Sequence, residues 1–209
     1  VRKMTTNSSI QESGLDITVI IDRSGSMEEI RDDAIGSFNA FLSDRKKSDP
    51  DALMTIVLFD DLYEILMNGI PIMDVPPFTR ETFVPRGSTA LLDAVGKTIG
   101  AIQSRPHQDD SVIIAILTDG QENASQEWNG EQIRTFIQNL EDKGWDFYYL
   151  SAALNAFDDG ERICIKSYKN LPHGDMDEAY RHFNEALLRK KMLMARKMQG
   201  CRDEDTMYQ

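Results

Sequence analysis

The stretch from Leu15 to Met27, LDITVIIDRSGSM, decides the fold. Its first part is rich in β-branched residues and almost continuously apolar from Ile17, which is typical of a strand covered on both faces. Its second part is short, polar and glycine-containing, and apolar residues at helical spacing follow directly. The order of strand, tight loop and helix therefore predicts a central parallel strand in an α/β sheet.

The same alternation continues on both sides of that central stretch. Runs of strand composition lie at 53–59, 63–67, 112–119, 145–150 and 167–171, the first two as an edge hairpin. Helical spacing predicts helices at 27–42, behind Ser88 and Thr89, at 133–140, at 157–163 and at 176–198. Strands that alternate with helices imply right-handed crossovers. We therefore expect a doubly wound, mostly parallel sheet with one antiparallel edge strand and helices on both faces.

The rest of the chain is expected to be less regular. Four of the seven prolines lie between Gly69 and Gly87, so this part should cross the surface as a long loop. In the terminal helix, the basic run 189–191 interrupts the apolar stripe. We divide the chain into a flexible leader (1–13), the α/β domain (14–173), a helix packed on the domain or projecting from it (174–200) and a loose acidic tail (201–209).

Composition excludes several classes of protein. The chain is 41% hydrophobic, which a disordered protein does not reach, and its net charge of -12 repels nucleic acid and anionic membranes. No apolar run approaches the roughly 18 residues of a membrane helix. The start of the chain lacks the pattern of a secretory signal, and Cys164 and Cys201 form neither a disulfide framework nor a zinc spacing. A reducing, cytoplasmic location is the expectation.

Five oxygen-bearing residues are predicted to meet at one rim of the sheet. Asp22, Ser24 and Ser26 end the first strand, Thr89 precedes a helix, and Asp119 ends a buried strand. In an open parallel sheet, ligands bind beyond the carboxyl ends of the strands. Hydroxyl and carboxylate oxygens are the ligands of hard cations, so the sequence predicts a metal site there.

These residues carry a family resemblance. The D-x-S-x-S segment, with Thr89 67 residues after Asp22 and Asp119 a further 30 residues on in T-D-G, resembles the metal-ion-dependent adhesion site (MIDAS) of von Willebrand factor type A (VWA) domains. The resemblance covers roughly 15–172, and all five motif positions are filled. The segments D-R-S-G-S-M and T-D-G-Q-E-N-A-S look similar to stand-alone bacterial and phage-encoded members.

The resemblance implies roles for the five residues. Ser24 and Ser26 would bind the ion directly, Thr89 directly or through water, and Asp22 and Asp119 largely through water. Mg²⁺ is the expected ion, with Mn²⁺ as substitute. Mostly neutral ligands leave the ion enough charge to bind an Asp or Glu of a partner protein. Arrival of that carboxylate would change the Thr89 contact, and the preceding proline-rich loop is expected to move with it.

Three functions compete on the sequence. The leading hypothesis is a non-enzymatic, metal-dependent protein-binding module, because no base or nucleophile accompanies the five oxygens. The second is a structural subunit of a larger assembly, such as a phage particle, in which the metal stabilises loops. The third is a Mg²⁺-dependent phosphohydrolase, which would need a second Asp where Ser24 stands.

Other residues have two open interpretations each. Glu122 and Asn123 either border the ligand face or cap the turn toward the next helix. The methionines of the terminal helix either pack or form an adaptable partner surface. Two further types of residue are expected to be structural, because they lack partners at ligand spacing: His107, His173 and His182 at the surface, and Cys164 in packing.

Overall fold

The fold is a single six-stranded sheet covered by helices on both faces. The computed structural model describes residues 14–119, 121–151, 167–170 and 175–207. In these residues the strand order is β3-β2-β1-β4-β5-β6, and only the β2–β3 pair is antiparallel. The predicted α/β class is confirmed, including the antiparallel edge. The strands are β1 Asp16–Asp22, β2 Leu53–Phe59, β3 Tyr63–Pro71, β4 Val112–Thr118, β5 Asp146–Ser151 and β6 Ser167–Asn170.

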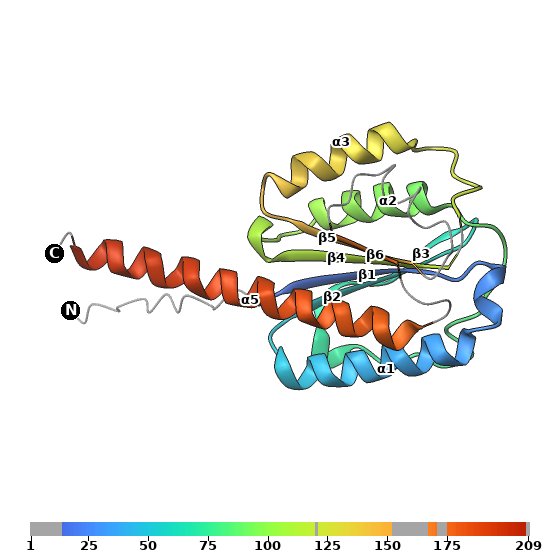
Figure 1. The fold of residues 1–209 in the computed structure, drawn as a ribbon, viewed down its shortest axis with the longest axis horizontal. Coiled ribbons are helices and arrows are strands. Elements are labelled where there is room, and N and C mark those ends of the chain that lie inside the picture. Colours follow the sequence, from blue (N-terminus) through green and yellow to red (C-terminus); the bar gives the residue numbers. More distant parts are fainter. Residues whose placement is uncertain (1–13, 120, 152–166, 171–174, 208–209) are drawn as a thin grey trace, which may run out of the picture.

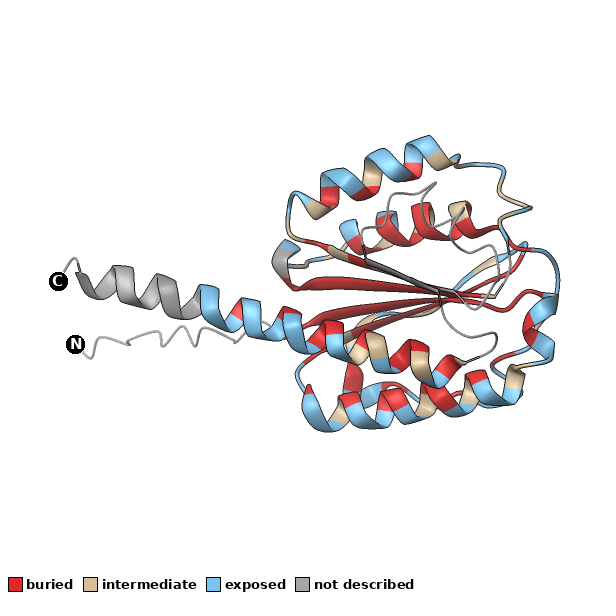
Figure 2. Cartoon of the chain, viewed as in Figure 1, coloured by how far each residue is buried: buried red, intermediate tan, exposed pale blue. Residues whose placement is uncertain are grey.

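In the part of the chain that the structure describes, four long helices form the outer layers. Helices α1 (Arg31–Ser48) and α5 (Met176–Met207) lie on one face, and α2 (Leu91–Gln103) and α3 (Gly130–Glu141) on the other (Figure 1). Side chains alternate along each strand, so β1 contributes to two cores. Ile17, Val19 and Ile21 pack toward α1 and α5, and Ile20 packs toward α2 and α3. Figure 2 shows that β1 and β4 are buried along their length.

Two helices begin later than the sequence predicted. A 3₁₀ turn, η1 (Gly25–Glu28), follows β1, and α1 starts only at Arg31. Met27 therefore belongs to this turn and not to α1. Its buried side chain anchors the turn to the core directly after the strand. Helix α2 starts at Leu91, with Ala90 as its N-cap residue. Ser88 and Thr89 are thus not its caps, and the capping groups come from a distant loop described below.

The proline-rich segment contains more regular structure than expected. Strand β3 continues to Pro71, and a 3₁₀ turn, η2 (Ile72–Asp74), follows it. Outside this segment, after α2, a third 3₁₀ turn, η3 (Asp109–Ser111), leads into β4. The rest of the segment up to α2 runs over the surface, and buried side chains such as Phe83 anchor it to the core. A long loop anchored in this way is an ordered part of the fold.

Helix α5 is longer than predicted and is held by the basic run that interrupts its stripe. The Lys190 ammonium is buried, and it donates to the Gly144 carbonyl and pairs with Asp146 at 2.9 Å. The Lys191 ammonium reaches Asp49 at 2.6 Å. Residues 201–207, expected as part of the tail, continue the helix, and the sequence offers no proline there to end it.

Some expectations lie outside the described residues. They are the leader 1–13, the helix at 157–163, Cys164 and His173. Among the described residues, none of the helices combines the length and hydropathy that crossing a bilayer requires.

Candidate metal site

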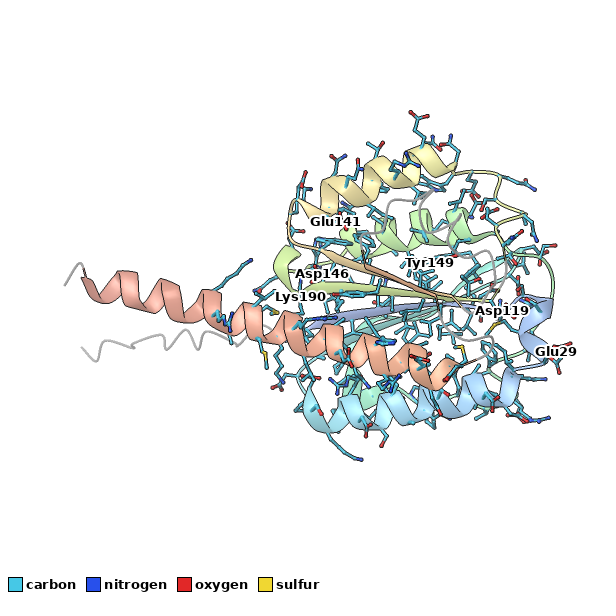
Figure 3. All side chains as sticks on the ribbon, in the orientation of Figure 1. Glu29, Asp119, Glu141, Asp146, Tyr149 and Lys190 are labelled. Carbon is cyan, nitrogen blue, oxygen red and sulfur yellow. The ribbon has the colours of Figure 1, made fainter. Side chains whose placement is uncertain are left out.

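The candidate site lies where the strand order reverses. Strands β1 and β4 are parallel neighbours, and the chain leaves β1 toward β2 on one side and β4 toward β5 on the other. This arrangement opens a crevice beyond their carboxyl ends. Asp22 is the last residue of β1, and Asp119 directly follows β4. Figure 3 labels Asp119 at this end of the sheet.

Hydrogen bonds connect four of the five predicted ligands. The buried Asp22 carboxylate accepts the Ser24 amide at 2.7 Å and the Thr118 hydroxyl at 2.6 Å. The Ser24 and Ser26 hydroxyl oxygens are 3.1 Å apart, and the Ser26 hydroxyl donates to Asp119 Oδ1 at 2.7 Å. Two loops that are 93 residues apart in the sequence are therefore joined directly through Ser26 and Asp119.

Thr89 lies on a third loop that is held between the other two. Its amide donates to Asn123 Oδ1 at 2.9 Å, and its carbonyl accepts the Asn123 and Ala124 amides. On the other side, the Gly25 amide donates to the Gly87 carbonyl at 3.2 Å. The Thr89 side chain is buried, and the bonds that join the other four residues do not include its hydroxyl. The structure thus places the Thr89 loop at the rim through its backbone.

The spacing of the oxygens fits a small octahedral cation. Mg²⁺ holds its ligands at about 2.0–2.1 Å, so adjacent ligand oxygens in an octahedron are about 2.9 Å apart. The two serine oxygens, which the resemblance implies to be direct ligands, are 3.1 Å apart, close to that value, and Asp119 is joined to this pair by its 2.7 Å hydrogen bond with Ser26. A serine hydroxyl can donate to a carboxylate and still direct a lone pair toward an ion. These residues are therefore suited to hold the ion that the resemblance implies.

The charge balance at the rim also favours a cation. The pKa of Asp22 is raised to about 6, chiefly by burial and to a smaller extent by the charge of Asp119, while hydrogen bonds from Thr118 and Ser24 offset part of the rise. Burial and the charge of Asp119 both disfavour the ionised form of Asp22. A bound cation would offset both, because it supplies the opposite charge at short range.

A buried ion-pair network beside the site was missed at the level of sequence. Asp60 is fully buried, and its Oδ2 accepts the Nε groups of Arg23 and Arg86, each at 2.8 Å. Arg23 also pairs with Glu64 at 2.7 Å. In the sequence, Asp60 follows an apolar run, as many turn residues do. Arg23 occupies a variable position of the D-x-S-x-S motif. The sequence pattern therefore gave no reason to pair these two residues.

A second unpredicted feature fixes the loop that follows Asp119. The Glu122 carboxylate accepts the Leu92 amide of α2 at 2.9 Å and the Ser125 amide of its own loop at 2.8 Å. In return, Asp93 of α2 accepts the three successive amides of 126–128. Glu122 is therefore a cap, but for α2, which precedes it. Helix α3 has a separate capping box formed by Asn129 and Gln132.

The remaining candidates lie away from this rim. His107 Nδ1 is 2.9 Å from the Arg105 carbonyl, and His182 is 3.2 Å from Glu178 on α5. Within the described part of the chain, no cluster of three or more His, Cys, Asp or Glu side chains is suited to a metal. The candidate site differs from such clusters because hydroxyl groups supply part of its oxygens.

Comparison with known proteins supports the fold and leaves the family open. No family model matches the sequence, and the search of curated proteins gives no significant match. Among solved structures, the D319A mutant of the PilB minor pilin from Streptococcus sanguinis matches with a TM-score of 0.62 and 13% identity, over 87% of this chain and 62% of that one. The pilus adhesin SpaC from Lactobacillus rhamnosus GG, in an open conformation, matches with a TM-score of 0.60 and 11% identity, over 85% and 30%.

A third match carries a metal. Proximal thread matrix protein 1 from the mussel byssus, with a zinc-occupied MIDAS motif, has a TM-score of 0.58 and 14% identity, over 81% of this chain and 46% of that one. This chain thus spans less than two thirds of each of these structures. At such identities the likeness shows the fold alone, and the fold is VWA-like.

Proposed function

We propose that the chain is a non-enzymatic protein-binding module in which Mg²⁺ bridges to an Asp or Glu of a partner. The ion would be held by Asp22, Ser24, Ser26, Thr89 and Asp119, with Mn²⁺ as a substitute. The observation that carries this proposal is the run of oxygens through Ser24, Ser26 and Asp119, spaced at 3.1 and 2.7 Å beyond the ends of β1 and β4. The pilin, adhesin and byssus proteins that share the fold add support.

The burial pattern gives the ion a closed side and an open side. Asp22 and Ser24 are buried, whereas Ser26 is exposed. An ion between them would thus have buried ligands on one side and a free coordination position facing solvent on the other. A partner carboxylate would approach there, attracted by an ion that neutral hydroxyls leave largely unneutralised. An acidic protein could bind an acidic side chain in this way.

The same residues argue against phosphoryl chemistry. The residue two positions after Asp22 is Ser24, and its hydroxyl contacts Ser26 rather than a base. The nearby Arg23 guanidinium is buried and pairs with Asp60 and Glu64, so it is not exposed to an incoming phosphate. Positioning and charge stabilisation of the phosphoryl group are what such enzymes need.

The first test measures the ion itself. We expect calorimetry to show one Mn²⁺ site in the wild type that Mg²⁺ competes for, and no measurable binding in Asp119→Ala. The matched control is Asp74→Ala, which removes an exposed carboxylate from η2 and should bind like the wild type. Equal affinity in wild type and Asp119→Ala would refute the site.

The second test measures the partner. A partner captured from the source lysate in Mg²⁺ should be released by EDTA and should not be retained by Asp119→Ala. Replacing its essential carboxylate by an amide should also abolish capture. A partner retained equally in EDTA would favour the structural-subunit alternative, and turnover of a generic phosphate ester would favour the phosphohydrolase.

A further inference from the structure

Asp60 lies at the centre of a charge network that touches two of the three metal-site loops. Its side chain is 0% exposed, and the Arg23 side chain is 5% exposed. Asp60 Oδ2 accepts both arginine Nε groups, from Arg23 and Arg86, at 2.8 Å. Asp60 Oδ1 accepts the Leu62 amide at 2.6 Å, which fixes the orientation of the carboxylate. Each oxygen of this carboxylate is therefore committed within the protein.

The partners of Asp60 flank the proposed ligands in sequence. Arg23 directly precedes Ser24, and Arg86 lies three residues before Thr89. The Asp60 carbonyl also accepts the amide of Ala90, the residue after Thr89, at 2.9 Å. One residue thus holds the Ser24 loop through its side chain and both ends of the Thr89 segment through its side chain and backbone.

The two loops are also joined directly, and there is little free space between them. The Arg86 amide donates to the Arg23 carbonyl at 2.8 Å. Gly87 has a φ of +66°, and a Cβ there would lie 1.9 Å from Asp61 Oδ1. Only glycine fits this place without displacing the loop. The separation of the two loops is therefore set by a close-packed junction with Asp60 at its centre.

The charge state of Asp60 agrees with a permanent role in holding the loops. Burial raises the pKa of its carboxyl, but the hydrogen bonds from Arg86 and Leu62 and the charge of Arg23 outweigh this and lower the pKa. The carboxylate stays ionised at neutral pH, so both arginines keep their counter-charge.

We infer that Asp60 is a positioning residue of the metal site, which sets the separation of the Ser24 and Thr89 loops while contributing no oxygen to the ion. The inference rests on the proposed function, because it concerns how well the five ligands converge. A ligand displaced by a fraction of an ångström fits the strict octahedral geometry of Mg²⁺ poorly. Loss of Asp60 should therefore weaken metal binding from a distance.

The test compares two buried carboxylates at opposite ends of the sheet, one at the start of β1 and one directly after β2. Asp16, at the start of β1, forms a two-armed ion pair with Arg105 at 2.7 Å. Asp60→Asn removes a buried counter-charge from Arg23 and Arg86, and Asp16→Asn removes one from Arg105, so both variants should lower the melting temperature. We expect Mn²⁺ affinity to fall at least tenfold in Asp60→Asn and to stay within twofold of wild type in Asp16→Asn.

A second, milder pair of variants tests the same inference if Asp60→Asn does not fold. Arg86 is 50% exposed, so Arg86→Ala removes one arm of the network without emptying the core. Its control is Arg80→Ala, which breaks an exposed pair with Asp32. We expect a severalfold loss of Mn²⁺ affinity in the first variant and none in the second. Water-proton relaxation by bound Mn²⁺ should also rise in Arg86→Ala, as water replaces the withdrawn Thr89 loop.

The outcomes separate this inference from the proposed function. If the wild type binds no Mn²⁺, the proposed function fails. If the wild type binds Mn²⁺ and Arg86→Ala matches it in affinity and relaxation, the positioning role is overturned while the metal site stands. Equal losses of affinity in Asp60→Asn and Asp16→Asn would also overturn it, because the effect would then follow stability alone.

Discussion

Two buried aspartates at the rim have opposite electrostatic surroundings. Asp22 is bonded to an amide and a hydroxyl, and burial raises its pKa to about 6. Asp60 is bonded to two guanidinium groups, and they lower its pKa despite burial. The first carboxylate lacks a counter-charge that an ion could supply, whereas the second already has one within the protein. This contrast separates the proposed ligand from its support.

The lowered pKa of Asp60 gives stability a defined pH dependence. Its folded-state pKa lies below the ordinary value of 3.8, so its contribution is fully present above that pH and is lost as pH falls through the folded pKa. We expect Asp60→Asn to cost about 3 kcal/mol of unfolding free energy at pH 7. Urea titrations should show the same difference in unfolding free energy between wild type and Asp60→Asn at pH 7 and at pH 4.5. The difference should be smaller at pH 2.5. A difference unchanged at pH 2.5 would contradict this assignment.

The sequence indicated which residues gather at the candidate site better than it indicated the residues around them. Asp22, Ser24, Ser26 and Asp119 occur at motif spacing directly after apolar runs, so local pattern and fold topology placed them at one rim. Pairs such as Arg23 with Asp60 form only through the tertiary fold, across 37 residues. Single-sequence periodicity contains no information on such partners. Lys190 was misinterpreted for the same reason, since its partners Gly144 and Asp146 lie on another element.

At the scale of elements, the loop after β4 and the start of α2 form one unit. Glu122 caps α2, Asp93 of α2 holds the three amides of 126–128, and Asn123 bonds the Thr89 backbone. The sequence led us to expect that the proline-rich loop moves with Thr89, and these bonds couple Thr89 to the 122–128 segment as well. Any change in its contact with the ion must move or strain the 122–128 segment as well.

Partner binding should therefore be visible in this unit. We expect amide hydrogen exchange of Leu92 and of 126–128 to change when the partner binds in Mg²⁺, because their acceptors lie in the unit that contains Thr89. The Leu53 amide, bonded to Leu15 at the far end of the sheet, should be unaffected. Partner-bound protein with unchanged exchange in 122–128 would show that Thr89 does not respond.

Helix α2 offers a matched pair of glycines one turn apart. A Cβ on Gly96 would lie 2.5 Å from the Trp128 ring, whereas one on Gly100 meets nothing within 4 Å. Alanine in a helix is favoured over glycine by roughly 0.5–1 kcal/mol. We thus expect Gly100→Ala to raise the unfolding free energy by about that amount and Gly96→Ala to lower it by about 1–3 kcal/mol. Thermal melts check both expectations. If both variants were more stable than the wild type, the Trp128 ring would have to move aside without cost.

At the scale of the whole molecule, the candidate site and the end of α5 lie on opposite sides. The rim is at the carboxyl ends of β1 and β4, whereas Lys190 binds the start of β5 and Lys191 binds Asp49 just after α1. Figure 3 labels Asp119 and Lys190 at these two ends. Beyond Met194, α5 leaves the domain, and residues 195–197 are exposed (Figures 1 and 2).

Truncation should separate the packed part of α5 from the projecting part. Residues through Met194 contribute buried side chains, Phe183 and Leu187 among them, to the core shared with α1. Removing 198–209 should leave the melting temperature within about 2 °C, whereas removing 176–209 should expose that core and abolish soluble expression. A stable soluble product of the longer deletion would show that the sheet does not need α5.

The course of α5 determines how the molecule would carry tension. If a partner bound at the candidate site were pulled against the end of α5, the force would act nearly along the helix axis, because the helix runs from that end of the sheet to the opposite end (Figure 1). The contacts from Tyr180 through Lys191 then resist sliding together instead of separating one after another. Shear of this kind requires many contacts to break at once, so the module would transmit force while remaining folded.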